Sequence, residues 1–285
     1  MKIVSLDIGG TSIKSCLFDN EKLTDMRETN NDGKLGGEHL VKMALEIVSS
    51  YGKFNRIGIS TAGQVNSDKG IIIYANENIP KYTGTDLRHI FSKEFGVEVA
   101  VENDVNAAAL GEASFGAGQN SSDFLCLTYG TGIGGAIVID KKIYKGASFS
   151  AGEFGHIITH GIKGGYYESY ASTTALVKNV EAINPRLDNG RDIFANMNDD
   201  AVKSAIDDWI NEILLGLASL THIFNPSLIV LGGGVMSNAY VIASIKERLT
   251  DYIMSSYANV AVTPASLGNT AGLYGAYYLA KERMQ

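Results

Sequence analysis

The sequence has little of what marks several classes of protein. Its 285 residues hold only two cysteines, Cys16 and Cys126, too few for a disulfide framework or a cysteine metal cluster. Each lies in an apolar, strand-like run, so we expect two buried free thiols. No apolar run is long enough to span a bilayer. The opening MKIVSLDIGG predicts a strand and not a signal peptide, because its apolar part is short and ends in glycines. We therefore expect a cytoplasmic protein with no membrane partner.

Basic residues are also few. Lys and Arg number 24 against 31 Asp and Glu, which gives a net charge of -7. Affinity for phosphate backbones comes mainly from Lys and Arg, so this balance disfavours a nucleic-acid partner. What is present, 45% hydrophobic and 19% charged residues, is typical of a globular protein with a large core. The length suggests one or two domains.

Strands alternate with helices in the first third of the chain. The strand-like runs are MKIVSLDI, SIKSCLFD, EKLTDMRET, RIGISTAG and VEVAVEND. The helix-like runs are EHLVKMALEIVSSYG, TDLRHIFSKEFG and VNAAALGEASFG, the first with Leu40, Met43 and Ile47 at helical spacing. This alternation predicts a parallel or mixed sheet covered by helices.

The strand pattern restarts near Gly116–Ser122 with a hairpin from DFLCLTYG to GAIVID, followed by an irregular glycine-rich stretch. A long helix is predicted from about Asp199 to Phe224, ended by Asn225-Pro226. SLIVLGGGV predicts a buried strand that runs into a glycine turn, and NTAGLYGAYYLAKERMQ predicts a closing helix. The apolar face of the long helix consists of Ile206, Ile210, Ile213, Leu214, Leu217 and Leu220.

One hairpin pattern occurs twice. LDIGGTSIKSCLFDNEKL overlays LTYGTGIGGAIVIDKKIY without a gap, and this predicts two similar α/β halves that face each other across a cleft. We expect an N-terminal domain over residues 1–117, with the C-terminal helix, about 270–285, packing back on it, and a second domain over 118–269. The matching positions are Leu6 and Leu127, Gly9 and Gly130, and Asp19 and Asp140.

Three glycine-rich turns follow strands, at DIGGT, YGTGIGG and LGGGV. Glycine lets backbone N–H groups approach a phosphate chain closely, and Asp7 adds a carboxylate suited to magnesium or its bound waters. A single hairpin of this kind favours the interpretation as an ordinary tight turn, but three glycine-rich turns after strands are harder to explain that way. None is a P-loop, and GTGIGG leads into a strand and not into the helix that a dinucleotide fold requires.

Polar side chains follow the strand in VENDVNAAALGE. Asn103 and Asp104 stand where a strand ends and a helix begins, the edge at which α/β proteins bind ligands. Both residue types are also preferred helix caps, and position alone favours Asp104 as a cap. Beside phosphate-binding loops, the same carboxylate becomes a candidate general base for a hydroxyl nucleophile.

A third cluster, Glu153, His156, His160 and Glu168, lies in SFSAGEFGHIITHGIKGGYYES. Carboxylates and imidazoles hydrogen-bond vicinal hydroxyls well, as a sugar ligand requires. Each histidine is also compatible with an ordinary loop or core position. A zinc site is disfavoured because the spacing is not a standard zinc pattern such as H-E-x-x-H.

The ordered motifs DIGGT, NENIP, VENDVNAAALGE, YGTGIGG, AGEFGH, ESYAS, LGGGV and GNTAGLYGA strongly resemble those of the ROK family of repressors and sugar kinases. The resemblance covers nearly the whole chain. It implies two duplicated actin-like ATPase (ribonuclease H-like) α/β domains with ATP in a central cleft, which explains the repeated hairpin.

The resemblance also implies roles for single residues. Asp104 would be the catalytic base, and Asp7 would bind magnesium through water. Sugar binding would fall to Gly63, Asn78, Asn103, Asp104, Glu153, His156 and Glu168. ATP binding would fall to Asp7, Gly9, Gly10, Thr11, Gly130, Thr131, Gly132, Gly134, Gly232, Gly233 and Gly234.

Two departures from the family pattern follow. Most members carry C-x-C-G-x-x-G-C-x-E, which binds a structural zinc with a histidine that matches His156. Here Thr159, Gly161 and Tyr166 stand in place of the cysteines and only Glu168 remains, so we expect no zinc. This loss resembles some β-glucoside kinases of the family. The family's repressors place a helix-turn-helix before the kinase-like part, whereas this sequence starts at the first strand, which argues against DNA binding.

The sequence thus predicts a cytoplasmic ATP- and Mg²⁺-dependent sugar kinase of the hexokinase type. It would phosphorylate a hydroxymethyl hydroxyl of a hexose or β-glucoside, with fructose or an N-acetylhexosamine as alternative substrates. A second hypothesis is a sugar-sensing protein on the same fold without turnover. A homodimer is expected from the resemblance alone.

Overall fold

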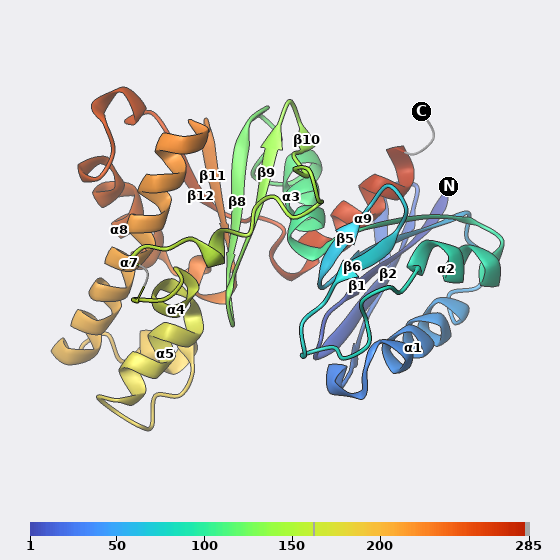
Figure 1. The fold of residues 1–285 in the computed structure, drawn as a ribbon, viewed down its shortest axis with the longest axis horizontal. Coiled ribbons are helices and arrows are strands. Elements are labelled where there is room, and N and C mark those ends of the chain that lie inside the picture. Colours follow the sequence, from blue (N-terminus) through green and yellow to red (C-terminus); the bar gives the residue numbers. More distant parts are fainter. Residues whose placement is uncertain (162, 283–285) are drawn as a thin grey trace. The chain divides into compact units, whose positions relative to one another are not determined.

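The computed structural model describes residues 1–161 and 163–282 (Figure 1). The chain divides into two compact units. The first consists of Met1–Gly116, Ile143–Ala151 and the residues from Asn269 on, and the second of Ala117–Lys142 and Gly152–Gly268. None of the helices within the described residues has the length and apolarity needed to cross a membrane.

The first unit contains a five-stranded sheet made of β1 (Lys2–Ile8), β2 (Ser12–Asp19), β3 (Lys22–Asn30), β4 (Arg56–Thr61) and β7 (Glu98–Asn103). The strand order is β3-β2-β1-β4-β7. β2 pairs antiparallel with β1 and β3, whereas β4 pairs parallel with β1 and β7. A separate hairpin of β5 (Gln64–Asn66) and β6 (Ile71–Tyr74) was not predicted from the sequence.

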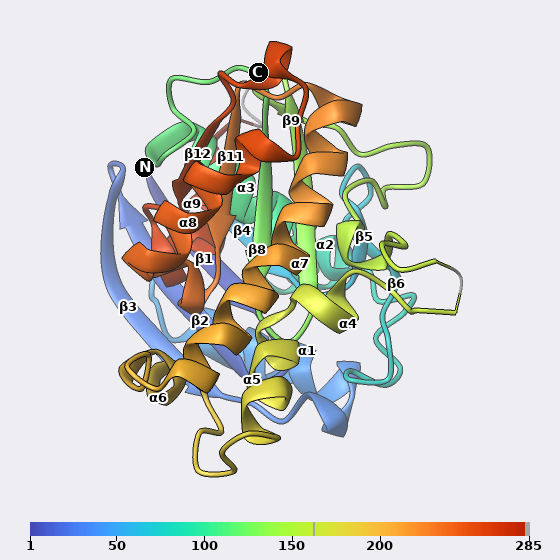
Figure 2. The same cartoon turned by 90° about the vertical axis from the view of Figure 1, so that its left-hand side faces the viewer.

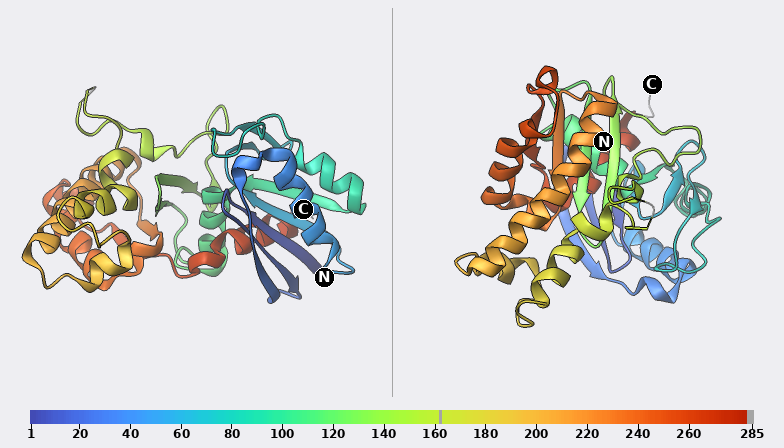
Figure 3. Two further views of the ribbon diagram at one scale, coloured as in Figure 1. Left: turned by 90° about the horizontal axis from the view of Figure 1, so that it is seen from below. Right: turned by 60° about the vertical axis from the view of Figure 1, so that its left-hand side comes forward.

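Helices cover both faces of this sheet. α1 (Gly37–Ser49) and α2 (Leu87–Phe95) pack on the face that carries Val4, Leu6 and Ile8. α9 (Ala271–Glu282) packs on the other face, against Ile3 and Phe18, and also contacts α3 (Asp104–Phe115) (Figure 3). Side chains alternate between the faces of a strand, so β1, β4 and β7 are buried on both sides, whereas the edge strand β3 is not.

The buried stripe of α1 is not quite the predicted one. Leu40 is fully buried, but Met43 and Ile47 are only partly buried beside the core. Val41, Ala44 and Val48 complete the inward face. Met43 and Ile47 therefore lie at the edge of the buried face, because a helix that packs on a sheet buries a band wider than one line of residues.

α9 lies unusually close to its neighbours. A Cβ on Gly275 would stand 1.7 Å from the carbonyl oxygen of Ala107 in α3, and a Cβ on Gly58 in β4 would stand 2.0 Å from the carbonyl oxygen of Ala276. Only glycine permits such distances. The helix is further held by Arg56, whose guanidinium donates to the Ala280 carbonyl at 2.9 Å.

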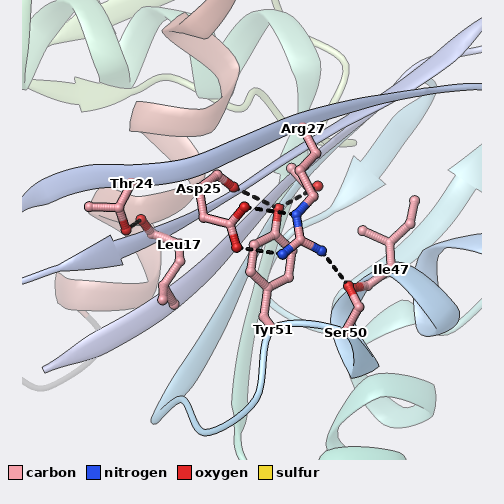
Figure 4. A network of polar contacts seen from close by, with 8 residues as sticks. Leu17, Thr24, Asp25, Arg27, Ile47, Ser50 and Tyr51 are labelled. Carbon is pink, nitrogen blue, oxygen red and sulfur yellow. Dashed lines mark hydrogen bonds and ion pairs between the residues drawn. The ribbon is translucent and has the colours of Figure 1, made fainter.

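A polar network ties the edge strand β3 to the end of α1 (Figure 4). The Arg27 guanidinium donates to the Asp25 carboxylate and to the Ser50 hydroxyl, and it lies 4.2 Å from the centre of the Tyr51 ring. The Tyr51 hydroxyl donates to the Asp25 carbonyl at 3.1 Å and lies 2.7 Å from the Ser15 hydroxyl. Asp25 adopts a left-handed φ of 47°, at the place where the β2–β3 register shifts.

The second unit repeats this strand plan. Its strands are β8 (Phe124–Tyr129), β9 (Ile133–Ile139), β10 (Lys142–Ile143), β11 (Leu228–Gly232) and β12 (Ala261–Pro264), in the order β10-β9-β8-β11-β12. β9 pairs antiparallel with β8, and β11 pairs parallel with β8 and β12. This order is that of the first unit, element for element, so the predicted duplication is confirmed.

The repeat extends to the second turn of each hairpin. Asn20 and Glu21 between β2 and β3 both have positive φ, and so do Asp140 and Lys141 between β9 and β10. Two successive left-handed residues are typical of the two-residue turns that match strand twist. Cys16 in β2 and Cys126 in β8 are buried thiols, as predicted.

The helices of the second unit are α4 (Glu168–Ala171), α5 (Thr173–Glu181), α6 (Gly190–Ala195), α7 (Asp200–Phe224) and α8 (Ala239–Arg248). In Figure 2, α7 and α8 lie on the viewer's side of β8 and β11. The predicted apolar face of α7 is buried, and the Trp209 indole donates to the Ala171 carbonyl at 2.9 Å. Asn225, in the left-handed region, ends the helix as predicted.

Candidate active site

Three parallel strands of the first unit bring predicted site residues to one sheet edge. β1, β4 and β7 run parallel, with Asp7 opposite Ser60 and Thr61 opposite Asn103 in the register. Asp104 follows as the first residue of α3. The carboxyl edge of such strands is where α/β proteins bind ligands. Asp7, Asn103 and Asp104 are therefore gathered at the expected edge of one unit.

The residue that caps α3 is Asn103 and not Asp104, which corrects the cap assignment made from the sequence. Asn103 has extended backbone angles, φ -60° and ψ 149°, and its Oδ1 accepts from the N–H groups of Val105 and Asn106 at 3.0 and 3.1 Å. Its Nδ2 donates to the Gly63 carbonyl at 2.9 Å and to Asp104 Oδ1 at 2.8 Å. Asn103 thus caps α3 and orients Asp104, and the Asp104 carboxylate also accepts from the Val105 N–H at 2.9 Å.

The electrostatics of this edge favour a proton on Asp104. Burial, and second the negative charge of Asp7, raise the pKa of Asp104 from 3.8 to about 7. Burial also raises the pKa of Asp7, opposed by a hydrogen bond that the Ser60 hydroxyl donates to Asp7 Oδ1 at 2.7 Å. Two neighbouring carboxyl groups with raised pKa values are suited to a divalent cation, whose charge would relieve both.

The first glycine turn is braced from outside. The Asn31 side-chain amide donates to the carbonyls of Gly9 and Gly10 at 3.3 and 3.4 Å, and the Asn31 N–H donates to the Thr11 carbonyl at 2.7 Å. Asn31 was not singled out in the sequence, because nothing in its neighbourhood shows that β3 returns beside the turn. The brace holds the Gly9–Gly10 carbonyls in one orientation.

The second and third glycine turns both lie in the second unit. Gly130, Thr131 and Gly132 join β8 to β9, and Gly134 lies within β9. Gly232 ends β11, and Gly233 and Gly234 follow it. Gly233 has a φ of 107°, and a Cβ there would stand 2.1 Å from the Tyr129 carbonyl oxygen. The third turn therefore lies directly against the start of the second.

One glycine in each turn has no packing reason to be glycine. At Gly10, Gly130 and Gly234 a Cβ would meet no protein atom within 4 Å, and none of the three has a left-handed φ. An ordinary tight turn explains Gly233 but not these three. A Cβ at these positions would project into open space beside the backbone.

Glu168 is the residue of the third predicted cluster that the structure joins to a glycine turn. Its Oε2 accepts from the Ile133 N–H at 3.2 Å. A Cβ on Gly132 would stand 2.5 Å from this oxygen, and one on Gly155 would stand 2.7 Å from it. The carboxylate thus lies between the second turn and the 3₁₀ turn Phe154–His156.

Other residues predicted to bind the sugar are exposed to solvent. Glu153 and His156 are exposed, with 3.9 Å between Glu153 Oε2 and His156 Nδ1, and the His156 ring lies 5.1 Å from that of Tyr166. Asn78, in the first unit, is exposed. His160 has a different partner, because its Nε2 lies 2.6 Å from Glu212 Oε2 on α7.

The residues at the family's zinc positions do not fit that metal. Thr159, Gly161 and Tyr166 offer no thiolate, and His156 and His160 are directed to different partners. Over the described ranges 1–161 and 163–282, no three His, Cys, Asp or Glu side chains gather as a metal site. The segment is held by other contacts, chiefly those of Tyr167, which is fully buried.

Two sheets of matching order, each opening with a glycine-tipped hairpin, define the actin-like ATPase fold. The chain belongs to the ROK family, whose family model matches residues 3–283.

Three relatives illustrate the range of this family. A β-glucoside kinase from Listeria monocytogenes is 33% identical over 98% of this chain and 97% of its own. A ROK family glucokinase from Streptomyces griseus, solved with glucose and AMPPNP, is 30% identical, with a TM-score of 0.85 over 99% of this chain and 100% of its own. The xylose repressor of Bacillus subtilis is 28% identical over 95% of this chain and 75% of its own. The first two are sugar kinases and the third is a regulator.

Proposed function

We propose that this chain, a hexokinase-type sugar kinase of the ROK family, transfers the γ-phosphoryl group of Mg-ATP to a hydroxymethyl hydroxyl of a hexose or β-glucoside. The observation that carries the proposal is the Asp104 carboxyl group, with a pKa of about 7, at the strand edge of the unit that holds the Gly9–Gly10 turn. A carboxyl group with a pKa near neutrality is suited to accept a proton at physiological pH.

The proton and the phosphoryl group move in one step. The oxygen of the sugar hydroxyl attacks the γ-phosphorus while Asp104 accepts the proton of that hydroxyl. The bond between the γ-phosphorus and the bridging oxygen of ADP breaks in the same step. Asn103 fixes the carboxylate through the 2.8 Å bond to Oδ1. Positioning the oxygen in line with the leaving group contributes to the rate together with proton removal.

The phosphates would be bound by backbone N–H groups at the three glycine turns. A phosphate would come closest to the backbone at Gly10, Gly130 and Gly234, where a Cβ would meet no protein atom within 4 Å. Asp7 would hold Mg²⁺ through a water molecule, and the bound cation would offset the charge of the phosphates. Glu153, His156, Glu168 and Asn78 would bind the sugar hydroxyls.

A panel of sugars with an ADP-release assay tests this proposal. Glucose, cellobiose, fructose and N-acetylmannosamine would each be offered with Mg-ATP, and the phosphorylated position identified by mass spectrometry and NMR. Turnover of none of them, with sugar binding retained in calorimetry, would favour the second candidate, a sugar sensor. The identity to the xylose repressor is the observation behind that alternative.

The pH profile should show Asp104 as the base. At sub-saturating Mg-ATP and sugar we expect kcat/KM to rise with pH and level off above about 7, the pKa of Asp104 in the protein alone. A profile that stays flat between pH 5 and 8 would remove Asp104 from the base role.

The same group predicts a trend in stability. The folded state binds the proton of Asp104 more tightly than the unfolded state, whose pKa is near 3.8. Its contribution to the free energy of unfolding should therefore fall as pH rises from about 4 to about 7 and stay low above that. Chemical unfolding of Asp104→Asn across this range should lack that part of the decline. An identical pH dependence in both proteins would show that the pKa is not raised.

Zinc should contribute nothing to the fold. Thiolates supply much of the affinity in mixed Cys/His sites, and the 157–167 segment contains none. We expect elemental analysis of purified protein to find no stoichiometric zinc, and dialysis against EDTA to leave the melting temperature unchanged. One zinc per chain would contradict this.

A further inference from the structure

We propose that the buried phenol pair Tyr129–Tyr167 is a positioning device. It fixes the sugar-side Glu168 against the second glycine turn and so couples sugar binding to nucleotide binding, in the place where the family uses zinc. The inference rests on the proposed function. Neither tyrosine is assigned there to substrate, and both act through their chain neighbours.

Each tyrosine is the sequence neighbour of a proposed ligand-binding residue. Tyr129 is the last residue of β8, directly before Gly130, and Tyr167 directly precedes Glu168. Both rings are fully buried, and their hydroxyl oxygens lie 2.9 Å apart. A displacement of either phenol therefore moves the backbone next to a proposed ligand-binding residue.

The hydrogen-bond direction within the pair is determined. The Tyr167 hydroxyl donates to the Ile213 carbonyl of α7 at 2.9 Å, so its single proton is used. The Tyr129 hydroxyl must then donate to the Tyr167 oxygen. Burial raises the pKa of both phenols, which keeps the protons that this chain requires.

A glycine in α7, Gly216, leaves room for the Tyr167 ring. A Cβ on Gly216 would stand 2.2 Å from the ring, so only glycine fits there. Glycine is unfavourable in the interior of a 25-residue helix, and accommodation of the ring accounts for its presence. The Tyr167 N–H also donates to the Ile157 carbonyl at 2.8 Å, which closes the segment that carries Thr159 and Gly161.

The pair is connected to three proposed binding elements of the second unit: Glu168 and the second and third glycine turns. Glu168 Oε2 receives the Ile133 N–H, the Thr173 hydroxyl donates to the Tyr129 carbonyl at 3.1 Å, and Gly233 packs on that same carbonyl. Sugar bound at Glu168 and phosphate bound at the second and third turns would therefore act on the same cluster of residues. Ligands that order the same cluster bind with positive coupling.

The test measures that coupling in the full-length protein. Calorimetry would give the affinity for glucose, or for cellobiose where the wild type prefers it, with and without Mg-AMPPNP. We expect the nucleotide analogue to tighten sugar binding by about 5-fold or more in the wild type. Tyr167→Phe should reduce this factor to near 1, because it removes the link to Ile213 and the acceptor for Tyr129.

Two further variants keep the test interpretable. Tyr129→Phe leaves the Tyr167–Ile213 bond intact and should retain part of the coupling, which also covers the case in which Tyr167→Phe does not fold. Tyr51→Phe removes a buried phenol with two hydrogen bonds in the first unit. It should cost stability and leave the coupling factor at the wild-type value.

The outcomes separate the inference from the function on which it rests. Full coupling in folded Tyr167→Phe, or in Tyr129→Phe alongside an unfolded Tyr167→Phe, overturns the inference. So does a wild type that binds sugar and AMPPNP independently. A wild type that binds no sugar of the panel overturns the proposed function and the inference together.

Discussion

Asp104→Asn should lower kcat by about 10²- to 10⁴-fold, the usual contribution of a general base. The amide keeps the shape of the side chain and the oxygen that accepts from Asn103 and Val105, at 2.8 and 2.9 Å in the wild type. It cannot take the proton of the sugar hydroxyl. Because desolvation and the charge of Asp7 disfavour the Asp104 carboxylate, the variant should be at least as stable as the wild type at pH 8.

The matched control is Asp200→Asn. Asp200 is the first residue of α7 after its cap Asp199, as Asp104 is the first residue of α3 after its cap Asn103. Both changes remove a negative charge from a helix N-terminus, which is worth only about 0.3–1 kcal/mol. Steady-state kinetics and thermal unfolding of both variants separate chemistry from helix electrostatics. Normal turnover by Asp104→Asn would leave the transfer without a base.

Gly275→Ala should destabilise the first unit by about 3 kcal/mol or more. In an open helix this change stabilises by up to about 1 kcal/mol. Here the new Cβ would stand 1.7 Å from the Ala107 carbonyl oxygen and 2.4 Å from its carbon. Backbone atoms on both sides must move apart, and overpacking of this kind costs typically 1–3 kcal/mol and at times more.

Thermal unfolding and limited proteolysis measure this effect. A loss of this size corresponds to a fall in melting temperature of roughly 6–12 °C for a domain of 150–250 residues. Lys281→Ala on the same helix is the control, because it removes only a surface ion pair with Glu21 and should change stability by less than about 1 kcal/mol. A Gly275→Ala protein as stable as the control would show that α9 packs more loosely than described.

The features predicted well from the sequence are those that repeat or have a period. The two hairpins, the long helix α7 and its buried face could be read from spacing, since burial of an amphipathic helix follows its apolar stripe. The short strand β12 and the hairpin β5–β6 were missed. β12 has four residues, one of them proline, and is held in place by its partner β11.

The sequence indicates where part of the candidate site lies. The positions of Asp7 and Asp104 at strand ends follow from the alternation of strands and helices. Asn and Asp are both preferred capping residues, so the sequence does not show whether Asn103 or Asp104 caps α3. The backbone angles in the structure decide this. The Tyr129–Tyr167 hydrogen bond joins residues 38 positions apart. Periodicity predicts that a side chain is buried, but it does not predict which other side chain it contacts. The sequence also does not distinguish the neighbours Tyr166 and Tyr167, of which Tyr166 is 49% exposed and Tyr167 is fully buried.

The placement of α9 has a consequence for biosynthesis. This helix covers one face of the first unit's sheet, yet its residues follow every residue of the second unit. A growing polypeptide emerges from its N-terminus, and domains generally fold as their residues emerge. The ribosome therefore delivers a complete second unit while Ile3, Cys16 and Phe18 still lack the cover of Leu273 and Tyr277. Until translation reaches that helix, the earliest-made part of the protein is the part most in need of a chaperone.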